Sequence, residues 1–221
     1  MRYGVLGCTG MLGSELDSAL QTATQLSIRP FPDDMPKWVK VSGADKCDVH
    51  INAVGFTAVD NAEAEQEEAS LVNAEYPRKL SLAAKGLGSR FLQISTDYVF
   101  DGTSSAPYKT TDTPNPQSAY GRSKLAGEIA VQESGADYQI FRTAWLYGAN
   151  GNCFPRTVAR VLKEQGQMRV VNDQVGQPTW TKDLAELIIA HQNVEESPRP
   201  RIVHATASGS CSWYEFACEI A

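Results

Sequence analysis

Short apolar segments alternate with longer amphipathic ones along nearly all of this 221-residue sequence. An apolar run of this kind is typical of a strand that is buried on both faces, whereas the amphipathic stretches have helical periodicity. Parallel strands need a long crossover between them, and a helix is the usual one. The alternation therefore predicts an α/β fold with a doubly wound parallel sheet, whose strands are Tyr3–Leu6, Leu26–Arg29, Val49–Val54, Phe91–Ser95, Tyr138–Arg142, Arg169–Val171 and Ile202–Ala205.

The helices of this pattern are expected to begin near Gly13, Asp60, Tyr120, Phe154, Lys182 and Ser212. The second has a start typical of a capping box, because Asp60 is followed three residues later by Glu63. The acidic residues at 65–68 could form a partner-binding patch. A solvated helix face is favoured instead, since the helix dipole stabilises negative charge in the early turns.

Two segments interrupt the alternation. Residues 30–46 contain three prolines and no helical periodicity, so we expect either an irregular loop or a sequence from which residues are missing. At the other end, an apolar helical stripe that begins at Trp213 stops at Ala221 after about two turns. The interrupted stripe predicts that further chain follows Ala221.

The charge balance narrows the class of partner. Lys and Arg number 20 against 26 Asp and Glu, which gives a net charge of −6. Non-specific binding of nucleic acid depends on basic residues, so this balance argues against it. No apolar run approaches the roughly 18 residues of a membrane span, and the first residues lack the apolar centre of a signal peptide. We therefore expect neither a nucleic-acid partner nor a membrane partner.

The five cysteines are scattered and odd in number. A secreted disulfide framework would have an even and denser set, and a zinc site would have closely spaced pairs. The pattern favours reduced thiols in a cytoplasmic protein, with no metal site of this type.

A glycine-rich segment follows the first strand directly and leads into the first helix. Its glycines are Gly7, Gly10 and Gly13. Glycine there allows a tight turn and a close approach of backbone amides to a pyrophosphate, whose charge the helix amino end stabilises. A plain strand-to-helix turn is the alternative. The position at the start of an α/β alternation favours a dinucleotide site formed by Gly7, Thr9, Gly10, Met11, Leu12 and Gly13.

The residue that meets the adenosine ribose is expected at the end of the second strand. Arg29 lies there, 22 residues after Gly7, with Asp33 and Asp34 shortly after it. A basic side chain accommodates a 2′-phosphate, so Arg29 favours NADPH, with NADH possible. Arg29 as a mere solvated strand end is the alternative.

A second pattern supplies candidate groups for proton transfer. Tyr120 and Lys124 are four residues apart, which places both on one face of a helix. A nearby ammonium would lower the tyrosine pKa from about 10 toward neutral pH. Thr96 follows the fourth strand, at the edge where an α/β sheet presents groups to a ligand. Thr96 could therefore bond a carbonyl oxygen that Tyr120 protonates.

Taken together, these motifs resemble the extended short-chain dehydrogenase/reductases, and among them the dTDP-4-dehydrorhamnose reductases. The resemblance covers essentially the whole chain and is strongest at Ile94–Gly102, where related epimerases and dehydratases have a different pattern. The other matching segments are Asp48–Ala53, Thr57–Asp60, Arg142–Gly148 and Asp173–Thr179.

The resemblance implies a Rossmann-like fold with residue roles at each matching position. Thr96, Tyr120 and Lys124 would be the catalytic residues, and Tyr120 and Lys124 would also contact the cofactor. Ala53 and Val54 would line the cofactor between adenosine and ribose, and Asn73 would lie on the helix behind the site. The sugar pocket would be lined by Thr57, Val59, Tyr98 and Trp145.

Two of these assignments have plain structural alternatives. Tyr98 and Trp145 lie near strand ends, where aromatic side chains usually pack in the core.

Glu15 matches a position that helps to bind Mg²⁺ at a dimer interface in some members, but it could equally be an exposed helical acid. Whether the chain is a monomer or a homodimer stays open.

By this resemblance the chain reduces the C4 ketone of dTDP-4-dehydro-L-rhamnose with NAD(P)H. The alternatives are a non-catalytic NADP-binding subunit, similar to the regulatory subunit of methionine adenosyltransferase, or another nucleotide-sugar reductase or epimerase. We expect an NAD(P)-binding domain over residues 1–145. Residues 146–221 would complete it and begin a small, here incomplete, substrate-binding lobe, because the family continues beyond this point with basic residues that contact the nucleotide.

Overall fold

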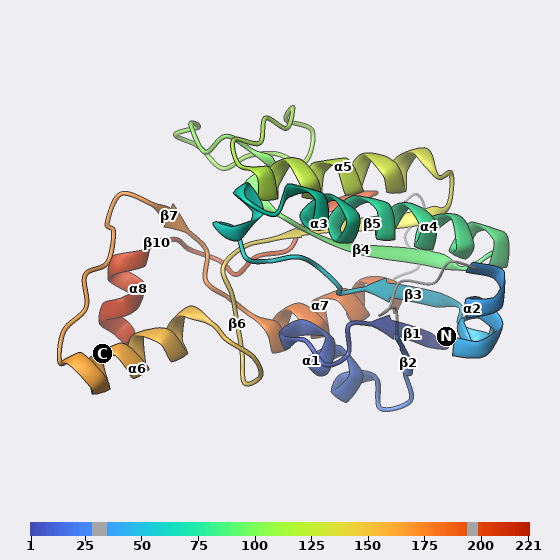
Figure 1. Ribbon diagram of the computed structural model, residues 1–221, viewed down its shortest axis with the longest axis horizontal. Helices are drawn as coiled ribbons and strands as arrows, with labels where there is room; N and C mark the ends of the chain where they lie inside the picture. Colours follow the sequence, from blue (N-terminus) through green and yellow to red (C-terminus); the bar gives the residue numbers. More distant parts are fainter. Residues whose placement is uncertain (28–34, 194–198) are drawn as a thin grey trace.

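The computed structural model describes residues 1–27, 35–193 and 199–221. Its centre is a six-stranded parallel sheet with the strand order β2-β1-β3-β4-β5-β9 (Figure 1). The predicted α/β fold with a parallel sheet is therefore confirmed. The strands of this sheet are β1 (Tyr3–Leu6), β2 (Thr24–Leu26), β3 (Val49–Asn52), β4 (Arg90–Thr96), β5 (Asp137–Thr143) and β9 (Ile202–His204).

Because the strands are parallel, their carboxyl ends share one edge of the sheet. Leu6 pairs with Asn52 at the ends of β1 and β3, and Thr96 pairs with Thr143 at the ends of β4 and β5. The loops that follow these strands leave from the same edge. In open α/β sheets this edge is where ligands bind.

Helices cover both faces of the sheet (Figure 1): α1 (Met11–Leu20) and α7 (Thr181–Asn193) on one, and α3 (Gln66–Ser70), α4 (Tyr76–Leu87) and α5 (Ala119–Glu133) on the other. Successive strand residues point to opposite faces and so feed two cores. Val5 packs with Leu16 of α1, whereas its neighbour Leu6 packs with Leu80 of α4.

The expectation of an irregular loop over 30–46 is wrong for its second half. Met35–Ser42 forms helix α2, followed by a 3₁₀ turn at Ala44–Lys46. Val39 and Ala44 are buried in the core on the α4 side, and this tertiary packing stabilises a helix that proline content argued against. Strand β2 is Thr24–Leu26 instead of the predicted Leu26–Arg29. Arg29 itself lies outside the residues that the structure describes.

The strand predicted at Arg169–Val171 does not exist. The segment has no regular structure, and Val171 is 51% exposed instead of buried as in a central strand. The edge position beside β5 belongs instead to β9. Val171 accepts a backbone hydrogen bond from Tyr214 at 3.1 Å.

The capping box predicted at Asp60 is also absent. Asp60 has helical backbone angles and its side chain makes no cap, because a capping residue needs an extended conformation. The helical segment from here continues through a 3₁₀ turn (Asn61–Glu63), α3 and a π-helical turn (Leu71–Glu75) into α4. Glu63 instead accepts a bond from the amide of Ala119, the first residue of α5, at 2.7 Å.

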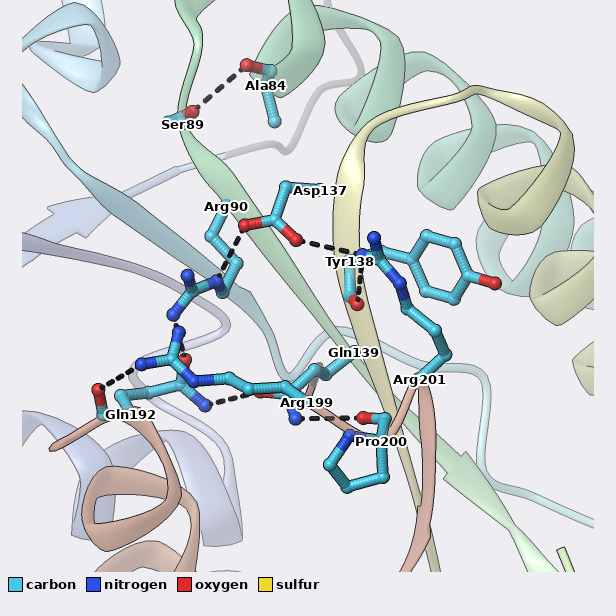
Figure 2. Close-up of polar contacts among 10 residues, drawn as sticks. All are labelled: Ala84, Ser89, Arg90, Asp137, Tyr138, Gln139, Gln192, Arg199, Pro200 and Arg201. Carbon is cyan, nitrogen blue, oxygen red and sulfur yellow. Dashed lines mark hydrogen bonds and ion pairs between the residues drawn. The ribbon is translucent and has the colours of Figure 1, made fainter. Parts of the chain in front are cut away.

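A polar network joins the amino ends of β4, β5 and β9 to the end of α7 (Figure 2). The Arg90 guanidinium donates to Asp137 at 2.9 Å and to Gln192 at 3.0 Å. Gln192 in turn donates to Gln139 at 2.8 Å, and Arg201 donates to Asp137 at 2.8 Å. The network therefore holds together the edge of the sheet opposite to the loops of the candidate site.

The last third of the chain adds elements that lie beside the sheet (Figure 1). Trp145 stacks on Trp213 with ring centroids 3.5 Å apart, and Phe154 packs against Trp213 at 4.5 Å. The described residues include no helix long and apolar enough to cross a membrane. The added elements are β6 (Leu146–Tyr147), α6 (Phe154–Gln165), β7 (Val175–Gly176), β8 (Thr179–Trp180), β10 (Cys211–Ser212) and α8 (Trp213–Ile220).

Candidate active site

The glycine-rich turn links β1 to α1 at the carboxyl edge. Gly7 has a φ of 84°, in the left-handed region that favours glycine. The amide of Gly10 donates to the Gly7 carbonyl at 2.9 Å and closes the turn. A Cβ at Gly13 would clash with the Gly7 carbonyl oxygen. The helix can therefore lie this close to the strand only with glycine at position 13.

The amino end of α1 is suited to an anion. Gly10 is the capping residue and has no side chain to bond the first-turn amides, and that turn contains no acidic residue. Backbone amides and the helix dipole are thus left to stabilise a negative charge. Thr9 is exposed beside them, whereas the side chain of Leu12 is buried in the core. Residues 7–13 therefore fit the pyrophosphate of a dinucleotide.

The chain after β3 runs next to this turn. A Cβ on Gly7 would lie only 3.0 Å from the Ala53 carbonyl carbon and 3.1 Å from the Val54 amide nitrogen. Asn73, in the π-helical turn, holds Phe56 further along this segment: its side chain accepts from the Phe56 amide at 2.9 Å and donates to the Phe56 carbonyl at 3.0 Å. The path of residues 53–56 is thus fixed from both sides.

Thr96, Tyr120 and Lys124 come together although two different elements carry them. Thr96 is the last residue of β4, and the other two lie in the first two turns of α5. The phenol of Tyr120 lies close enough to the Thr96 hydroxyl for that hydroxyl to lower its pKa. The Lys124 ammonium donates to the carbonyl of Ile94, two residues before Thr96, at 2.6 Å. Both side chains of the predicted pair therefore face the end of β4.

The amino end of α5 is positioned by close contacts. Ser118 caps the helix by accepting from the Gly121 amide at 3.0 Å. A Cβ at Gly121 would clash with the carbonyl oxygen of Tyr98, so glycine allows the helix to approach the loop after β4. The rings of Tyr98 and Tyr120 meet edge to face at 5.6 Å.

The expectation that Lys124 lowers the pKa of Tyr120 is wrong. Burial of the phenol raises the pKa of Tyr120 to about 12, and the hydrogen bond with Thr96 offsets only part of this effect. Tyr120 is 9% exposed, and the ammonium that was expected to act on it is bound to the Ile94 carbonyl instead. Tyr120 is consequently neutral at physiological pH and holds a proton that it can donate.

Burial also lowers the pKa of Lys124, to about 8, while the carboxylate of Glu128 acts in the opposite direction. A lysine with such a pKa is mostly charged at neutral pH but titrates within reach of it. Gly55 lies beside it, because a Cβ on that glycine would be 4.0 Å from the Lys124 nitrogen and 3.5 Å from the Asn73 amide oxygen. The ammonium thus lies where the loop after β3 meets α5.

The candidate sugar-pocket residues divide into two groups. Val59 and Tyr98 pack in the small cluster that contains Tyr120, and Thr57 is exposed on the loop after β3. Trp145 lies on the chain that leaves β5 and belongs to a different cluster, since it stacks on Trp213 and covers Gly176. Its φ of 45° is unusual for a residue other than glycine.

A buried ion pair beneath the site has no counterpart in the sequence-based reasoning. Glu128 is fully buried on α5, and Arg142 of β5 donates to it at 2.7 Å. Ser95 donates to the same carboxylate at 2.5 Å. Glu128 lies one turn after Lys124, and this four-residue spacing was the signal that could have found it.

Two further candidates gain no geometric support. Arg29 lies outside the described residues, as noted above. Glu15 is half-buried on α1, and the described residues contain no group of three or more His, Cys, Asp or Glu that could hold a metal ion. The magnesium assignment is therefore not carried further.

Comparison with known proteins shows the family to which the chain belongs. The family model described as "RmlD substrate binding domain" matches residues 1–221. A dTDP-4-dehydrorhamnose reductase of Escherichia coli is 42% identical over 231 residues, which cover 98% of this chain and 76% of the relative. The spore coat polysaccharide biosynthesis protein SpsK of Bacillus subtilis is 40% identical over 221 residues, with 98% and 77% covered.

Solved structures give the same result. A dTDP-4-dehydrorhamnose reductase of Clostridium acetobutylicum superposes with a TM-score of 0.91 at 38% identity, covering 100% of this chain and 79% of the other. The Bacillus anthracis dTDP-4-dehydrorhamnose reductase in complex with NADP has a TM-score of 0.89 at 35% identity, covering 99% and 79%. The chain therefore belongs to the RmlD family, and relatives named dTDP-4-dehydrorhamnose reductases match it over nearly its whole length.

Proposed function

We propose that this protein reduces the C4 ketone of dTDP-4-dehydro-L-rhamnose with NADPH and so forms dTDP-L-rhamnose. The observation that carries the proposal is the neutral, buried Tyr120, which lies next to Thr96 and one helical turn from Lys124. A reductase must supply a proton to the new alcohol oxygen, and a neutral phenol at the carboxyl edge of the sheet is a suitable donor. The identity of the sugar nucleotide is inferred from the family relationship.

The cofactor would bind along the carboxyl edge. Residues 7–13 would hold its pyrophosphate through backbone amides, and Ala53 and Val54 would line the stretch from adenosine to ribose. NADPH, when bound, supplies the hydride that the ketone carbon accepts. The NADP complex of the Bacillus anthracis relative supports the choice of a phosphorylated dinucleotide.

The side chains of the site would then move one proton and orient the ketone. Thr96 would hydrogen-bond the ketone oxygen, and Tyr120 would donate its proton to that oxygen as negative charge develops. Lys124 would hold the ribose hydroxyls next to the nicotinamide through its ammonium. Burial of all three groups keeps competing water away from the reacting carbon.

The sugar nucleotide would lie between the two clusters described above. Thr57, Val59 and Tyr98 would contact it from the sheet side, and Trp145 from the group that includes Trp213. This arrangement corresponds to a dinucleotide-binding domain over residues 1–145 and a segment, 146–221, that completes it and begins the substrate-binding lobe.

Replacing Tyr120 with phenylalanine tests the proposal. The change removes one hydroxyl, so it should leave NADPH affinity nearly intact and reduce turnover by about 10²–10⁴, as expected for a positioned acid. Tyr214→Phe, at an exposed position on α8, is the matched control. NADPH oxidation with dTDP-4-dehydro-L-rhamnose and a fluorescence titration of NADPH measure the two properties. A wild-type protein that binds NADPH but never turns over would favour the non-catalytic binding subunit.

Cofactor choice has its own test. Arg29 should favour NADPH through the 2′-phosphate, so Arg29→Ala should weaken NADPH binding and leave NADH binding unchanged. A charge-assisted contact of this kind is worth about 1.5–3 kcal/mol, or roughly ten- to a hundredfold in affinity. Equal losses for both dinucleotides, or tighter NADH binding by the wild-type protein, would remove Arg29 from the site.

A further inference from the structure

Asp97 is a carboxyl group next to the proton donor, and the mechanism above does not use it. It follows Thr96 directly, and its side chain accepts a hydrogen bond from the Thr96 hydroxyl at 3.0 Å. The Thr96 oxygen also accepts from the Tyr98 amide at 3.2 Å, and the same hydroxyl lies next to the Tyr120 phenol, whose pKa it lowers. One threonine hydroxyl thus connects Asp97 with Tyr120.

The hydroxyl of Thr96 has a single proton, and this limits what it can do. When Asp97 is ionised, the proton points to the carboxylate, so Thr96 has none to offer to Tyr120 or to a ketone oxygen. When Asp97 is protonated, the carboxyl group can donate to Thr96, and the Thr96 proton can point to Tyr120. The protonation state of Asp97 therefore sets the direction of the whole chain of hydrogen bonds.

Tyr120 needs a source of protons after each turnover. Burial disfavours its phenolate, and the Lys124 ammonium is bound to the Ile94 carbonyl rather than to the phenol. Thr96 is the hydroxyl next to the phenol, and Asp97 is the acid that Thr96 contacts. Burial raises the pKa of Asp97, although hydrogen bonds from Thr96 and from the amides of Asp97 and Tyr98 act against this effect.

The surroundings of Asp97 favour its neutral form. Tyr120 faces it from α5 and Tyr98 from its own loop, and the charge of Asp97 raises the pKa of both phenols. Asp60, on the loop after β3, also acts on Tyr98. Negative charge on Asp97 therefore disfavours the Tyr120 phenolate, and a phenolate disfavours ionisation of Asp97.

We propose that Asp97 acts through Thr96 as a positioning residue that stores a proton and returns it to Tyr120. The Tyr120 O–H bond breaks as the O–H bond of the new alcohol forms. The Thr96 O–H bond breaks as that of Tyr120 re-forms, and the Asp97 carboxyl O–H bond breaks as that of Thr96 re-forms. The half-buried carboxylate that is left takes its proton back from water. This inference rests on the reductase function proposed above.

Asp97→Asn is the direct test, because asparagine can form the hydrogen bond to Thr96 but cannot release a proton. We expect kcat of the wild-type protein to fall as pH rises and Asp97 ionises, and kcat of Asp97→Asn to be at least about tenfold lower and to lack this decline. Asp97→Glu should restore the decline, since it keeps an exchangeable carboxyl proton. Asp60→Asn, which changes an exposed carboxylate that is not among the groups that act on Asp97 or Tyr120, is the matched control and should behave as wild type.

An infrared pH titration of the free protein gives a readout that does not need turnover. With ¹³C-labelled aspartate, a protonated carboxyl band should persist above the usual range of aspartate and be missing in Asp97→Asn. If the wild-type protein is active and Asp97→Asn matches its rate and pH profile, or if no such band is seen, the relay is overturned and the reductase function stands. If the wild-type protein does not reduce the sugar nucleotide at any pH, the proposed function fails and the relay fails with it.

Discussion

At the scale of single residues, burial decides the chemistry of the candidate site. Tyr120 and Lys124 have pKa values shifted in opposite directions, and desolvation is the main cause for both. Burial disfavours a charged group whatever its sign, so it keeps the phenol protonated and brings the ammonium closer to losing its proton. The site therefore combines a neutral acid with a cation that titrates just above neutral pH.

The pKa of Lys124 leads to a pH prediction for cofactor binding. Below about 8 the lysine is charged and can donate to the ribose hydroxyls, whereas above that value it is neutral. We expect NADPH affinity to fall, by roughly ten- to a hundredfold, as pH rises through about 8. Fluorescence titrations from pH 6 to 10 would measure it. Lys124→Met should bind weakly at every pH, and a Lys124→Met profile that still declines would assign the titration to another group.

At the scale of elements, helix α5 is the part of the structure that brings the site together. It carries Tyr120 and Lys124 toward β4 and buries Glu128 against Ser95 and Arg142 below them. Asn73 links it to the opposite loop by donating to Ser123 at 2.9 Å. These contacts therefore fix the position of α5 along the strands and its rotation about its own axis. The placement of Tyr120 and Lys124 depends on both.

The close packing of α5 can be tested at Gly127. A Cβ there would clash with the carbonyl oxygen of Asn73, so Gly127→Ala should push the helix away from the π-helical turn. Overpacking of this kind costs about 1–3 kcal/mol of folding free energy, and kcat should fall with it. Gly86→Ala on α4, where a Cβ meets nothing within 4 Å, is the control and should be neutral or stabilising by up to about 1 kcal/mol. Urea unfolding and NADPH oxidation compare them. Equal behaviour of the two variants would contradict this view of α5.

At the scale of the whole molecule, the polar network and the candidate site lie at opposite ends of the strands. The loops of the candidate site leave from the carboxyl ends of the strands, and the network of Figure 2 joins their amino ends. Gln192 is fully buried in that network and bonds both Arg90 and Gln139. Changes there should therefore act on unfolding and not on turnover.

Gln192→Leu would separate the two properties. It leaves the buried side-chain oxygen of Gln139 without its donor, and such a loss costs about 1–3 kcal/mol. We expect a lower urea midpoint with kcat and NADPH affinity within about twofold of wild type at a temperature where the variant is folded. Gln117→Leu, on the exposed loop before α5, is the control for the substitution itself. A kcat that falls together with stability would show that the two edges are coupled.

The sequence by itself determined the alternation of strands and helices that makes an α/β fold, the glycine-rich turn and the pairing of Tyr120 with Lys124. These features are local, because periodicity and spacing follow from the geometry of a single strand, turn or helix. It also placed Thr96 at a strand end. The same reasoning was wrong about Arg169–Val171 and about the segment that forms α2, since both outcomes depend on what the rest of the chain offers to pack against.

Only the tertiary structure decided the electrostatics and the partners of these residues. The pKa of Tyr120 depends on how deeply α5 is buried, and no spacing along the chain contains that information. The same holds for the bond of Glu63 to α5, the stacking of Trp145 on Trp213 and the pairing of Glu128 with Arg142. Each joins segments distant in sequence, and a contact between distant segments exists only once the sheet has brought them together.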